Sequence, residues 1–257
     1  MTPPETAEAR IEPLEEAQIE EEYVEATTPL FTPELQVPGN PTVDLDTGSA
    51  QDILRYAVDQ FHPRLYVASS FQKEASVILD MLLKIEPTAR FFTIDTGNLF
   101  PETLDVWRRI EERYDVKIDV YNATDFAPAS ILSQSTPENT WAGEPDECCG
   151  KYKVAALQAA LLNVDAWVTG LRREQSHTRA ETRKVMWDGK NDRWKVCPLT
   201  DWTEKDVWNY IHENDVPYND LHDRGYSSIG CTTCTAPGTG REGRWAGSDK
   251  TECGLHA

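Results

Sequence analysis

The positions of the six cysteines constrain the fold of this 257-residue chain more than any other feature. Cys231 and Cys234 form a C-x-x-C pair, a spacing at which two thiolates from one turn reach the same metal centre. Cys148 and Cys149 are adjacent and lie far upstream, so a four-thiolate site would bring the middle of the chain against its end. Cys253 remains outside this set. A lone thiol next to a histidine near the end of the chain is expected to react rather than to hold structure together.

Three kinds of site could explain the four paired cysteines: buried thiols that pack as small hydrophobic groups, a structural zinc, or an iron-sulfur cluster. A C-x-x-C pair in a loop of Gly, Thr and Pro makes simple packing a poor explanation. Adjacent Cys148 and Cys149 suit one tetrahedral zinc badly, whereas a four-iron cluster offers each thiolate its own iron. The pattern therefore favours a cluster, with a zinc-binding interaction module as the remote alternative. Cys197 lies in an apolar extended run and is expected to be an inert core residue.

Negative charge is concentrated at the start of the chain. Residues 1–46 contain twelve Asp or Glu, one Arg and seven of the sixteen prolines, so they carry -11 of the formal net charge of -19. Such a segment has too little apolar content to offset its ordering entropy, and we predict a disordered acidic arm over 1–46. We assign the remainder to an α/β domain over 47–236 and a flexible C-terminal tail over 237–257.

Composition also limits where the protein acts and what it binds. No apolar run approaches the ~20 residues that span a bilayer, and no basic-then-apolar leader opens the chain, so we expect a cytoplasmic protein without membrane contact. In a reducing compartment, six cysteines argue for metal binding or catalysis rather than disulfides. The net negative charge argues against nucleic-acid binding.

Apolar periodicity alternates between extended and helical patterns along the domain. We predict strands at 65–69, 90–94, 116–121 and 166–169, and helices at 52–61, 74–85, 101–114, 151–162 and 203–213. Strands separated by single helices predict an α/β fold with a doubly wound parallel sheet, covered by helices on both faces.

Polar residues follow the first two predicted strands, where the ligands of such sheets bind. Ser69, Ser70 and Gln72 follow the first strand and open a helix, whose N-terminus attracts anions. The segment Asp95-Thr96-Gly97 follows the second strand. Each turn alone could be an ordinary capped turn, and the first lacks the G-K-[ST] core of a Walker A loop. Together they predict a nucleotide pocket.

A basic cluster follows the predicted strand 166–169. It consists of Arg172, Arg173, Arg179, Arg183 and Lys184. A solvated basic face is the usual meaning of such a run. At the expected ligand edge of an otherwise acidic protein, it instead predicts a site for clustered negative charge, such as a phosphate or sulfate anhydride.

With these motifs assembled, residues 50–257 closely resemble the assimilatory adenylyl-sulfate reductases. These form the iron-sulfur branch of the phosphoadenylyl-sulfate and adenylyl-sulfate reductase family, within the adenine nucleotide alpha-hydrolase-like superfamily. The resemblance rests on Ser70-Phe-Gln72, Asp95-Thr-Gly97 with Leu99-Phe-Pro-Glu102, Cys148-Cys149, Gly170-Leu-Arg-Arg-Glu-Gln-Ser176, Tyr226-Ser-Ser-Ile-Gly-Cys-Thr-Thr-Cys234 and Glu252-Cys-Gly-Leu-His256. An ATP pyrophosphatase of the same fold would be expected to carry a Ser-Gly-Gly loop, which is absent after the first strand.

The resemblance implies a function and a set of site residues. The enzyme would reduce adenylyl sulfate to sulfite and AMP, in the sulfate assimilation that feeds cysteine biosynthesis, and phosphoadenylyl sulfate is the alternative or second substrate. A [4Fe-4S] cluster would be ligated by Cys148, Cys149, Cys231 and Cys234. Cys253 would be the nucleophile, with His256 beside it, and substrate charge would be bound by Lys153, Arg172, Arg173, Arg241 and Arg244.

The implied reaction also needs a partner and a moving tail. Cys253 would carry an S-sulfonate until a second thiol attacks it, and reduced thioredoxin is the family's source of that thiol. We expect the tail to swing on its glycines, which are Gly238, Gly240, Gly243 and Gly247. Whether the enzyme forms a homo-oligomer is left open.

Overall fold

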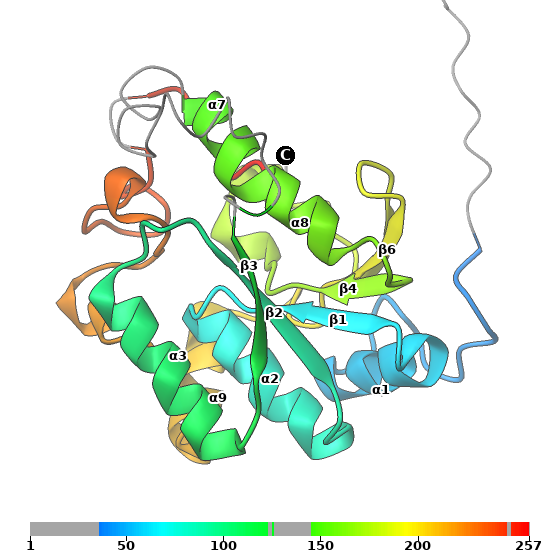
Figure 1. The fold of residues 1–257 in the computed structure, drawn as a ribbon. Helices are drawn as coiled ribbons and strands as arrows, with labels where there is room; N and C mark the ends of the chain where they lie inside the picture. Colours follow the sequence, from blue (N-terminus) through cyan, green and yellow to red (C-terminus); the bar gives the residue numbers. More distant parts are fainter. Residues whose placement is uncertain (1–35, 123–124, 126–144, 246–247, 257) are drawn as a thin grey trace, which may run out of the picture. The chain divides into compact units, whose positions relative to one another are not determined.

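A six-stranded sheet forms the centre of the computed structural model, which describes residues 36–122, 125, 145–245 and 248–256 (Figure 1). The strand order is β3-β2-β1-β4-β6-β5. The strands are β1 (Leu65–Ala68), β2 (Arg90–Asp95), β3 (Ile118–Asn122), β4 (Ala166–Val168), β5 (Val185–Asp188) and β6 (Arg193–Val196). All neighbours are parallel except β5, which runs antiparallel to β6 at one edge. The β5–β6 hairpin adds two strands that the sequence pattern had not assigned to the sheet.

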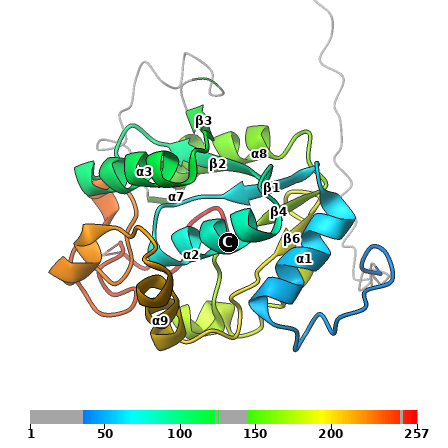
Figure 2. The same ribbon diagram turned by 90° about the horizontal axis from the view of Figure 1, so that it is seen from below.

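Helices cover both faces of the sheet, as Figures 1 and 2 show. The larger core lies on one face, under α1 (Ala50–Phe61), α2 (Lys73–Ile85), α3 (Pro101–Tyr114) and α9 (Glu204–Asn214). On the other face, Leu157 of α8 (Ala155–Ala160) packs with Tyr66, Phe92 and Trp167 of the strands. Successive residues of β1 point into different cores, as strand geometry requires. The predicted doubly wound α/β fold is confirmed.

The long helices begin and end where the sequence provides caps. The Ser49 hydroxyl accepts the Asp52 N–H at 3.2 Å and starts α1, and Pro101 occupies the first turn of α3. Thr203 and Asp206 form a capping box at the start of α9. Asp115 ends α3 in the left-handed conformation, with φ of 51°. Within the described residues, no helix is both long and apolar enough to cross a membrane.

The helix predicted over 151–162 is longer and less regular than expected. It comprises α7 (Pro145–Cys149), a π-helical turn over Gly150–Val154, and α8. A π turn takes one more residue than an α turn, so it changes which side chains share a face, and such turns are frequent at functional sites. Here the turn separates the adjacent cysteines from α8 and contains Lys153.

Part of the predicted acidic arm belongs to the folded core. Val37, Val43 and Leu45 pack against the larger core, and the Tyr56 hydroxyl donates to the Pro38 carbonyl at 2.9 Å. Apolar residues at three positions between 36 and 46 therefore anchor a segment whose charge had suggested disorder. Residues 1–35 of the predicted arm lie outside the described residues.

Candidate functional site

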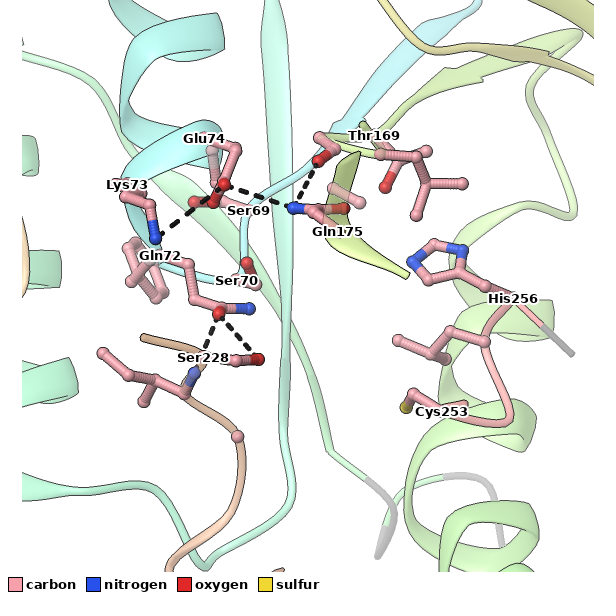
Figure 3. A pocket seen from close by; sticks show the side chains of 18 of the residues that line it. Ser69, Ser70, Gln72, Lys73, Glu74, Thr169, Gln175, Ser228, Cys253 and His256 are labelled. Atoms are coloured by element: carbon pink, nitrogen blue, oxygen red, sulfur yellow. Dashed lines mark hydrogen bonds and ion pairs between the residues drawn. The ribbon is translucent and has the colours of Figure 1, made fainter. Parts of the chain in front are cut away.

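A cavity of about 460 Å³ lies at the carboxyl ends of β1, β2 and β4 (Figure 3). Its walls include residues 69–73 after β1, Thr96 after β2, and residues 169–172 after β4. β1 lies between β2 and β4 in the sheet. The chain passes from β1 to β2 on one side, whereas β4 on the other side follows β3 in the chain, so the strand order reverses at β1. Ligands of open α/β sheets bind at such a reversal point. The cavity is thus at the sheet edge that the sequence indicated.

The loop after β1 supplies polar groups to one wall of this cavity. Ser69, Ser70 and Gln72 all line it, and the Ser69 hydroxyl is buried without a hydrogen-bond partner among the described residues. The Gln72 side-chain oxygen accepts the Ile229 N–H at 2.8 Å. Gln72 therefore also fixes the segment that leads to Cys231. The first turn of α2 begins here without a side-chain cap, so its N–H groups and dipole are directed toward a ligand.

Of the three residues predicted in the turn after β2, one lines the cavity and the other two shape the turn. Thr96 lines the cavity, and its hydroxyl is 3.2 Å from the Cys231 sulfur. The Asp95 carboxylate accepts the Gly97 N–H at 2.8 Å, and Gly97 has φ of 70°, so these two residues shape the turn. Neither Asp95 nor Gly97 is among the lining residues.

The basic cluster after β4 does not act as one group. Only Arg172 and Arg179 of its five members line the cavity. The other three contact groups elsewhere: Arg173 donates to the Thr182 carbonyl, Arg183 pairs with Asp46, and Lys184 pairs with Asp201.

Arg172 lies in a carboxylate-rich group, which we call the Arg172 cluster. The side chains of Arg172 and Glu74 are buried, whereas those of Glu174 and Glu204 are 53% and 49% exposed. Arg172 pairs with Glu74 at 3.0 Å, Glu174 at 2.8 Å and Glu204 at 3.2 Å, and Lys73 lies 3.3 Å from Glu204. Burial opposes the charge of Glu74, but Lys73 and Arg172 hold the pKa of its carboxyl below the usual value. The guanidinium of Arg172 is therefore balanced by protein carboxylates. Its geometry favours a structural role, and the predicted binding of substrate by Arg172 remains a prediction.

Cys253 lies in the wall opposite the first loop, together with His256 (Figure 3). Its side chain is buried, and the Lys153 ammonium is 3.9 Å from its sulfur. An ammonium group at this distance favours the ionised form of the Cys253 thiol. Burial opposes the charge of Lys153, but Cys231 and Cys253 raise the pKa of Lys153. The pair favours a thiolate facing a cation.

Glu252 connects the tail to two arginines of the cavity wall, in what we call the Glu252 cluster. Arg179 donates to its two oxygens at 2.8 and 2.7 Å, and Arg241 donates at 2.8 Å. Burial opposes ionisation, yet Arg179 and then Arg241 lower the pKa of Glu252 to about 2. Our sequence interpretation missed Glu252 as a site residue, because its main partner Arg179 is 73 positions away.

Arg244 is held by a tryptophan that the sequence analysis also missed. The Arg244 guanidinium lies 4.4 Å from the Trp245 ring centroid, and Arg241 lies 5.2 Å from it. A Cβ on Gly230 would lie 2.3 Å from the Arg244 Nη2, so the glycine before Cys231 leaves room for this guanidinium. The Nε groups of both arginines are buried without a partner among the described residues.

His256 stacks on Trp167, with ring centroids 5.8 Å apart and planes 4° apart. Lys195 lies 4.9 Å from the centroid of the same tryptophan. Burial, followed by the charges of Arg179 and Lys195, lowers the pKa of His256 to about 3. His256 is therefore neutral near pH 7, and it offers the cavity hydrogen bonds rather than charge.

The four cysteines predicted to bind metal line one small cavity, together with Lys153 and Trp245. In the described part of the chain, no three His, Cys, Asp or Glu side chains converge as closely as one metal ion requires. A four-iron cluster binds each thiolate through a different iron, so four thiols spread around a shared space fit a cluster better than a single zinc. The donor set and its arrangement thus fit the predicted [4Fe-4S] group.

Tail glycines and the sixth cysteine have packing roles. A Cβ on Gly238 would lie 2.7 Å from the Gly243 backbone nitrogen, and a Cβ on Gly243 would lie 2.0 Å from the Ala236 carbonyl oxygen. These two glycines therefore serve an ordered turn, Gly240 adopts φ of 57°, and Gly247 lies outside the described residues. Cys197 is fully buried, as expected, and burial raises its pKa to about 12.

Comparisons with known proteins identify the family of this chain. Residues 64–237 match the family model described as the phosphoadenosine phosphosulfate reductase domain. The adenosine 5'-phosphosulfate reductase of Geobacillus kaustophilus is 43% identical over 217 residues, covering 83% of this chain and 92% of that protein. The corresponding protein of Shouchella clausii is 44% identical over 210 residues, covering 80% of this chain and 87% of that protein.

Solved structures with the same fold include a member of this family and a more distant protein. The phosphoadenylyl-sulfate reductase of Candida auris, solved as a phosphate complex, has a TM-score of 0.64 and 32% identity, over 74% of this chain and 91% of that chain. The FMN adenylyltransferase of Candida glabrata shares the fold alone, with a TM-score of 0.55 and 14% identity over 74% of this chain and 62% of that chain. From the family model and these identities, we conclude that the chain belongs to the phosphoadenosine phosphosulfate reductase domain family.

Proposed function

We propose that this protein is an adenylyl-sulfate reductase of sulfate assimilation, which forms sulfite and AMP through an S-sulfonate on Cys253. The observation that carries the proposal is the charge around Cys253. Its thiol shares the cavity wall with four cations, Lys153, Arg179, Arg241 and Arg244, and their only carboxylate partner among the described residues is Glu252. An anionic thiolate that attacks an anionic anhydride requires such an excess of positive charge.

The polar groups of the cavity support binding of the nucleotide part. The Ser69 hydroxyl, the Nε groups of Arg241 and Arg244, and the His256 Nδ1 are buried without partners among the described residues, and all four residues line the cavity. Buried polar groups are normally hydrogen-bonded, so oxygens of a phosphate and a sulfate group suit these positions. The N-terminus of α2 suits the phosphate of AMP.

In the first step, the Cys253 thiolate attacks the sulfur of the sulfate group. The bond from that sulfur to the bridging oxygen breaks, AMP leaves with the bonding electron pair, and Cys253 carries the SO3 group. Lys153 is close enough to keep the thiol ionised, and Arg241 and Arg244 suit the charge on the departing AMP phosphate.

In the second step, a thiolate of reduced thioredoxin attacks the Cys253 sulfur. Sulfite leaves, a mixed disulfide forms, and the second thioredoxin thiol releases Cys253 as oxidised thioredoxin departs. The dithiol thereby supplies the two electrons of the reduction. Cys197 is fully buried and does not suit this task, so the resolving thiol comes from a partner. None of the six cysteines forms a disulfide in the described structure, which suits the reducing cytoplasm where such a partner acts.

We infer that Cys148, Cys149, Cys231 and Cys234 hold a [4Fe-4S] cluster. When bound, such a cluster supplies a fixed polarising charge beside Lys153, and we expect no change in its oxidation state during thiol exchange. Cys231→Ser should give protein depleted in iron and sulfide with little activity. Full iron occupancy in that variant would contradict the four-ligand assignment.

The test of the reaction uses the protein mixed with adenylyl sulfate in the absence of thioredoxin. We expect a burst of about one AMP per site followed by a stall, with one added SO3 on the peptide that contains Cys253. Reduced thioredoxin should then remove the group as sulfite. Cys253→Ser should retain the cluster and show neither burst nor adduct. Sulfite formation by Cys253→Ser, or an adduct on Cys197, would overturn the mechanism.

Phosphoadenylyl sulfate is the second candidate substrate, because the family description and the Candida auris structure carry that name. The two relatives described above, which are 43% and 44% identical to this chain, are instead named adenosine 5'-phosphosulfate reductases. We therefore expect a higher kcat/KM for adenylyl sulfate when both are assayed with the same enzyme and thioredoxin. Equal values would indicate a dual-substrate enzyme.

A further inference from the structure

Glu252 is the one residue of the Glu252 cluster that does not line the cavity. Arg179 and Arg241 line it, and Glu252 contacts both guanidiniums without being a lining residue itself. The same carboxylate accepts the backbone N–H of Cys253 at 2.8 Å. One side chain therefore joins the cysteine to two cations of the wall.

The contacts of Arg179 restrain its guanidinium in several directions. Its two bonds to Glu252 form a bidentate pair, which fixes the guanidinium plane as well as its distance. Arg179 also donates to the side-chain oxygen of Gln175, whose amide donates to Glu74 at 3.1 Å. The side chains of Arg179 and Glu252 are only 8% and 11% exposed, so water competes little for these contacts.

The charge of the Glu252 cluster is incomplete. Two guanidiniums share one carboxylate, which leaves one buried positive charge without a counter-ion in this group. Burial, followed by the charge of Arg179, lowers the pKa of Arg241 to about 10, which reflects the crowding of cations. An anion in the cavity would complete the balance.

We propose that Glu252 is a positioning residue that holds the Cys253 thiol and the Arg179 and Arg241 guanidiniums as one unit around the sulfate-phosphate anhydride. The proposal rests on the proposed function for the identity of the substrate. It assigns Arg179 to the anion-binding wall in place of Arg173. It predicts that loosening Glu252 separates the thiol from its cations while leaving the cavity and the cluster cysteines intact.

The first experiment measures tail position without any substrate. Holoenzyme is treated with iodoacetamide, alkylation of Cys253 is followed by peptide mass analysis, and each rate is divided by that of the same variant after unfolding. Glu252→Gln and Arg179→Lys should each alkylate at Cys253 roughly tenfold faster than the native protein, because the tail opens more often. Arg179→Lys leaves the tail sequence unchanged and loses the bidentate pair.

Glu242→Gln is the matched control, since Glu242 is an exposed tail residue that receives the same chemical change. Its alkylation rate should equal that of the native protein, and buried Cys197 should stay unreactive in every variant. Rates within twofold of native for both Glu252→Gln and Arg179→Lys would overturn the proposal.

The second experiment measures S-sulfonation in a single turnover with adenylyl sulfate. For Glu252→Gln we expect the rate at saturating substrate to fall by about 10²-fold, as misplacement by an ångström can produce, while half-saturation changes less than threefold. Visible absorption of the cluster should be unchanged. A large rise in half-saturation with a native maximal rate would show that Glu252 acts on binding alone and would overturn the positioning role.

The two experiments separate the two proposals. If the native protein forms no adduct with adenylyl sulfate, the proposed function fails, but the alkylation result still decides whether Glu252 holds Cys253. If the native protein forms the adduct and the variants behave like native in both assays, only the role of Glu252 fails.

Discussion

Two groups of cations border the same cavity and differ in how many carboxylates accompany them. In the Arg172 cluster, Arg172 and Lys73 are surrounded by three carboxylates, those of Glu74, Glu174 and Glu204. Around Cys253, the four cations Lys153, Arg179, Arg241 and Arg244 are accompanied in the described structure by one carboxylate, that of Glu252, which pairs with Arg179 and Arg241. The first group is neutralised by the protein itself. In the second group, Lys153 and Arg244 each lie 3.9 Å from a cysteine sulfur, those of Cys253 and Cys234, and a bound anion would complete the charge balance at Arg179 and Arg241.

This difference shows that a basic residue at a ligand edge is not by itself an anion site. Removing charges from water is expensive, so a buried guanidinium is paired with whatever anion lies closest. Where protein carboxylates suffice, the cation stabilises the fold. Where they are too few, the same chemistry attracts a substrate.

The largest expected effect comes from Lys153, the cation closest to the Cys253 sulfur. Lys153→Met should slow S-sulfonation by roughly 10²- to 10³-fold, the loss typical of removing one electrostatic contact to a transition state. Single-turnover release of AMP measures it, with iron content as the check on the cluster. The control is Lys205→Met, because Lys205 is an exposed lysine of α9. A native S-sulfonation rate in Lys153→Met would show that this lysine is not one of the cations that act on the substrate.

The next effect compares one arginine from each group. Arg172→Met should lower the free energy of unfolding by about 3 kcal/mol, because it leaves the buried Glu74 carboxylate with fewer partners, while the AMP burst of the folded protein is retained. Arg244→Met should reduce the sulfonation rate at least tenfold, by roughly 1.4 kcal/mol in the barrier, with a smaller loss of stability. Urea unfolding and single-turnover assays on both variants measure these quantities. Equal losses of stability and of sulfonation rate in the two variants would show that the two groups of cations do not differ in their roles.

A smaller effect concerns acid stability. The pKa of Glu252 is about 2 in the folded protein against an ordinary value of 4.5, so folding stability from its pairs is complete above about pH 4.5 and is lost as the pH falls towards 2. The contribution is on the order of 2 to 3 kcal/mol at neutral pH. In urea unfolding from pH 6 to pH 3, Glu252→Gln should be less stable than native at pH 6, with a difference that shrinks on acidification. A constant difference would show that the carboxylate charge is not involved.

The smallest effect is expected from deleting residues 1–35. This removes ten acidic residues and one arginine. Neither the activation free energy of sulfonation nor the free energy of unfolding should change by more than ~0.5 kcal/mol, because only carboxylates in contact with the cations set the charge balance at the cavity. Deletion through Asp46 should instead cost roughly 1 to 3 kcal/mol, since Val37, Val43 and Leu45 leave the core. A rate that changes on removing 1–35 would show that the charge of this segment affects the site.

Periodic segments and paired cysteines were predictable from sequence, because both depend on residues close together in the chain. The parallel strands at 65–68 and 90–95 and their ligand edge were found in this way. The meeting of Cys149 with Cys231 joins distant positions, and it was predicted because one four-thiolate site needs both cysteine pairs. The β5–β6 hairpin was missed although its strands are as long as β1, because Asp188, Arg193 and Lys195 interrupt the apolar pattern that marks the other strands. The neutralisation of Arg172 was missed because its partner Glu74 is 98 positions away. Glu252 was missed for the same reason.

The burial of Cys253 has a consequence for the speed of the whole cycle. With 8% exposure, its sulfur is sheltered from a protein-sized reductant while the tail is closed. If closure is favoured by about 2.7 kcal/mol, only ~1% of molecules present the sulfur at any moment, and the apparent rate of resolution falls by about 10²-fold. Tighter closure therefore accelerates the first half-reaction and slows the second. Maximal turnover requires an intermediate closing free energy, which makes the strength of the Glu252 contacts a quantity that selection is expected to tune rather than maximise.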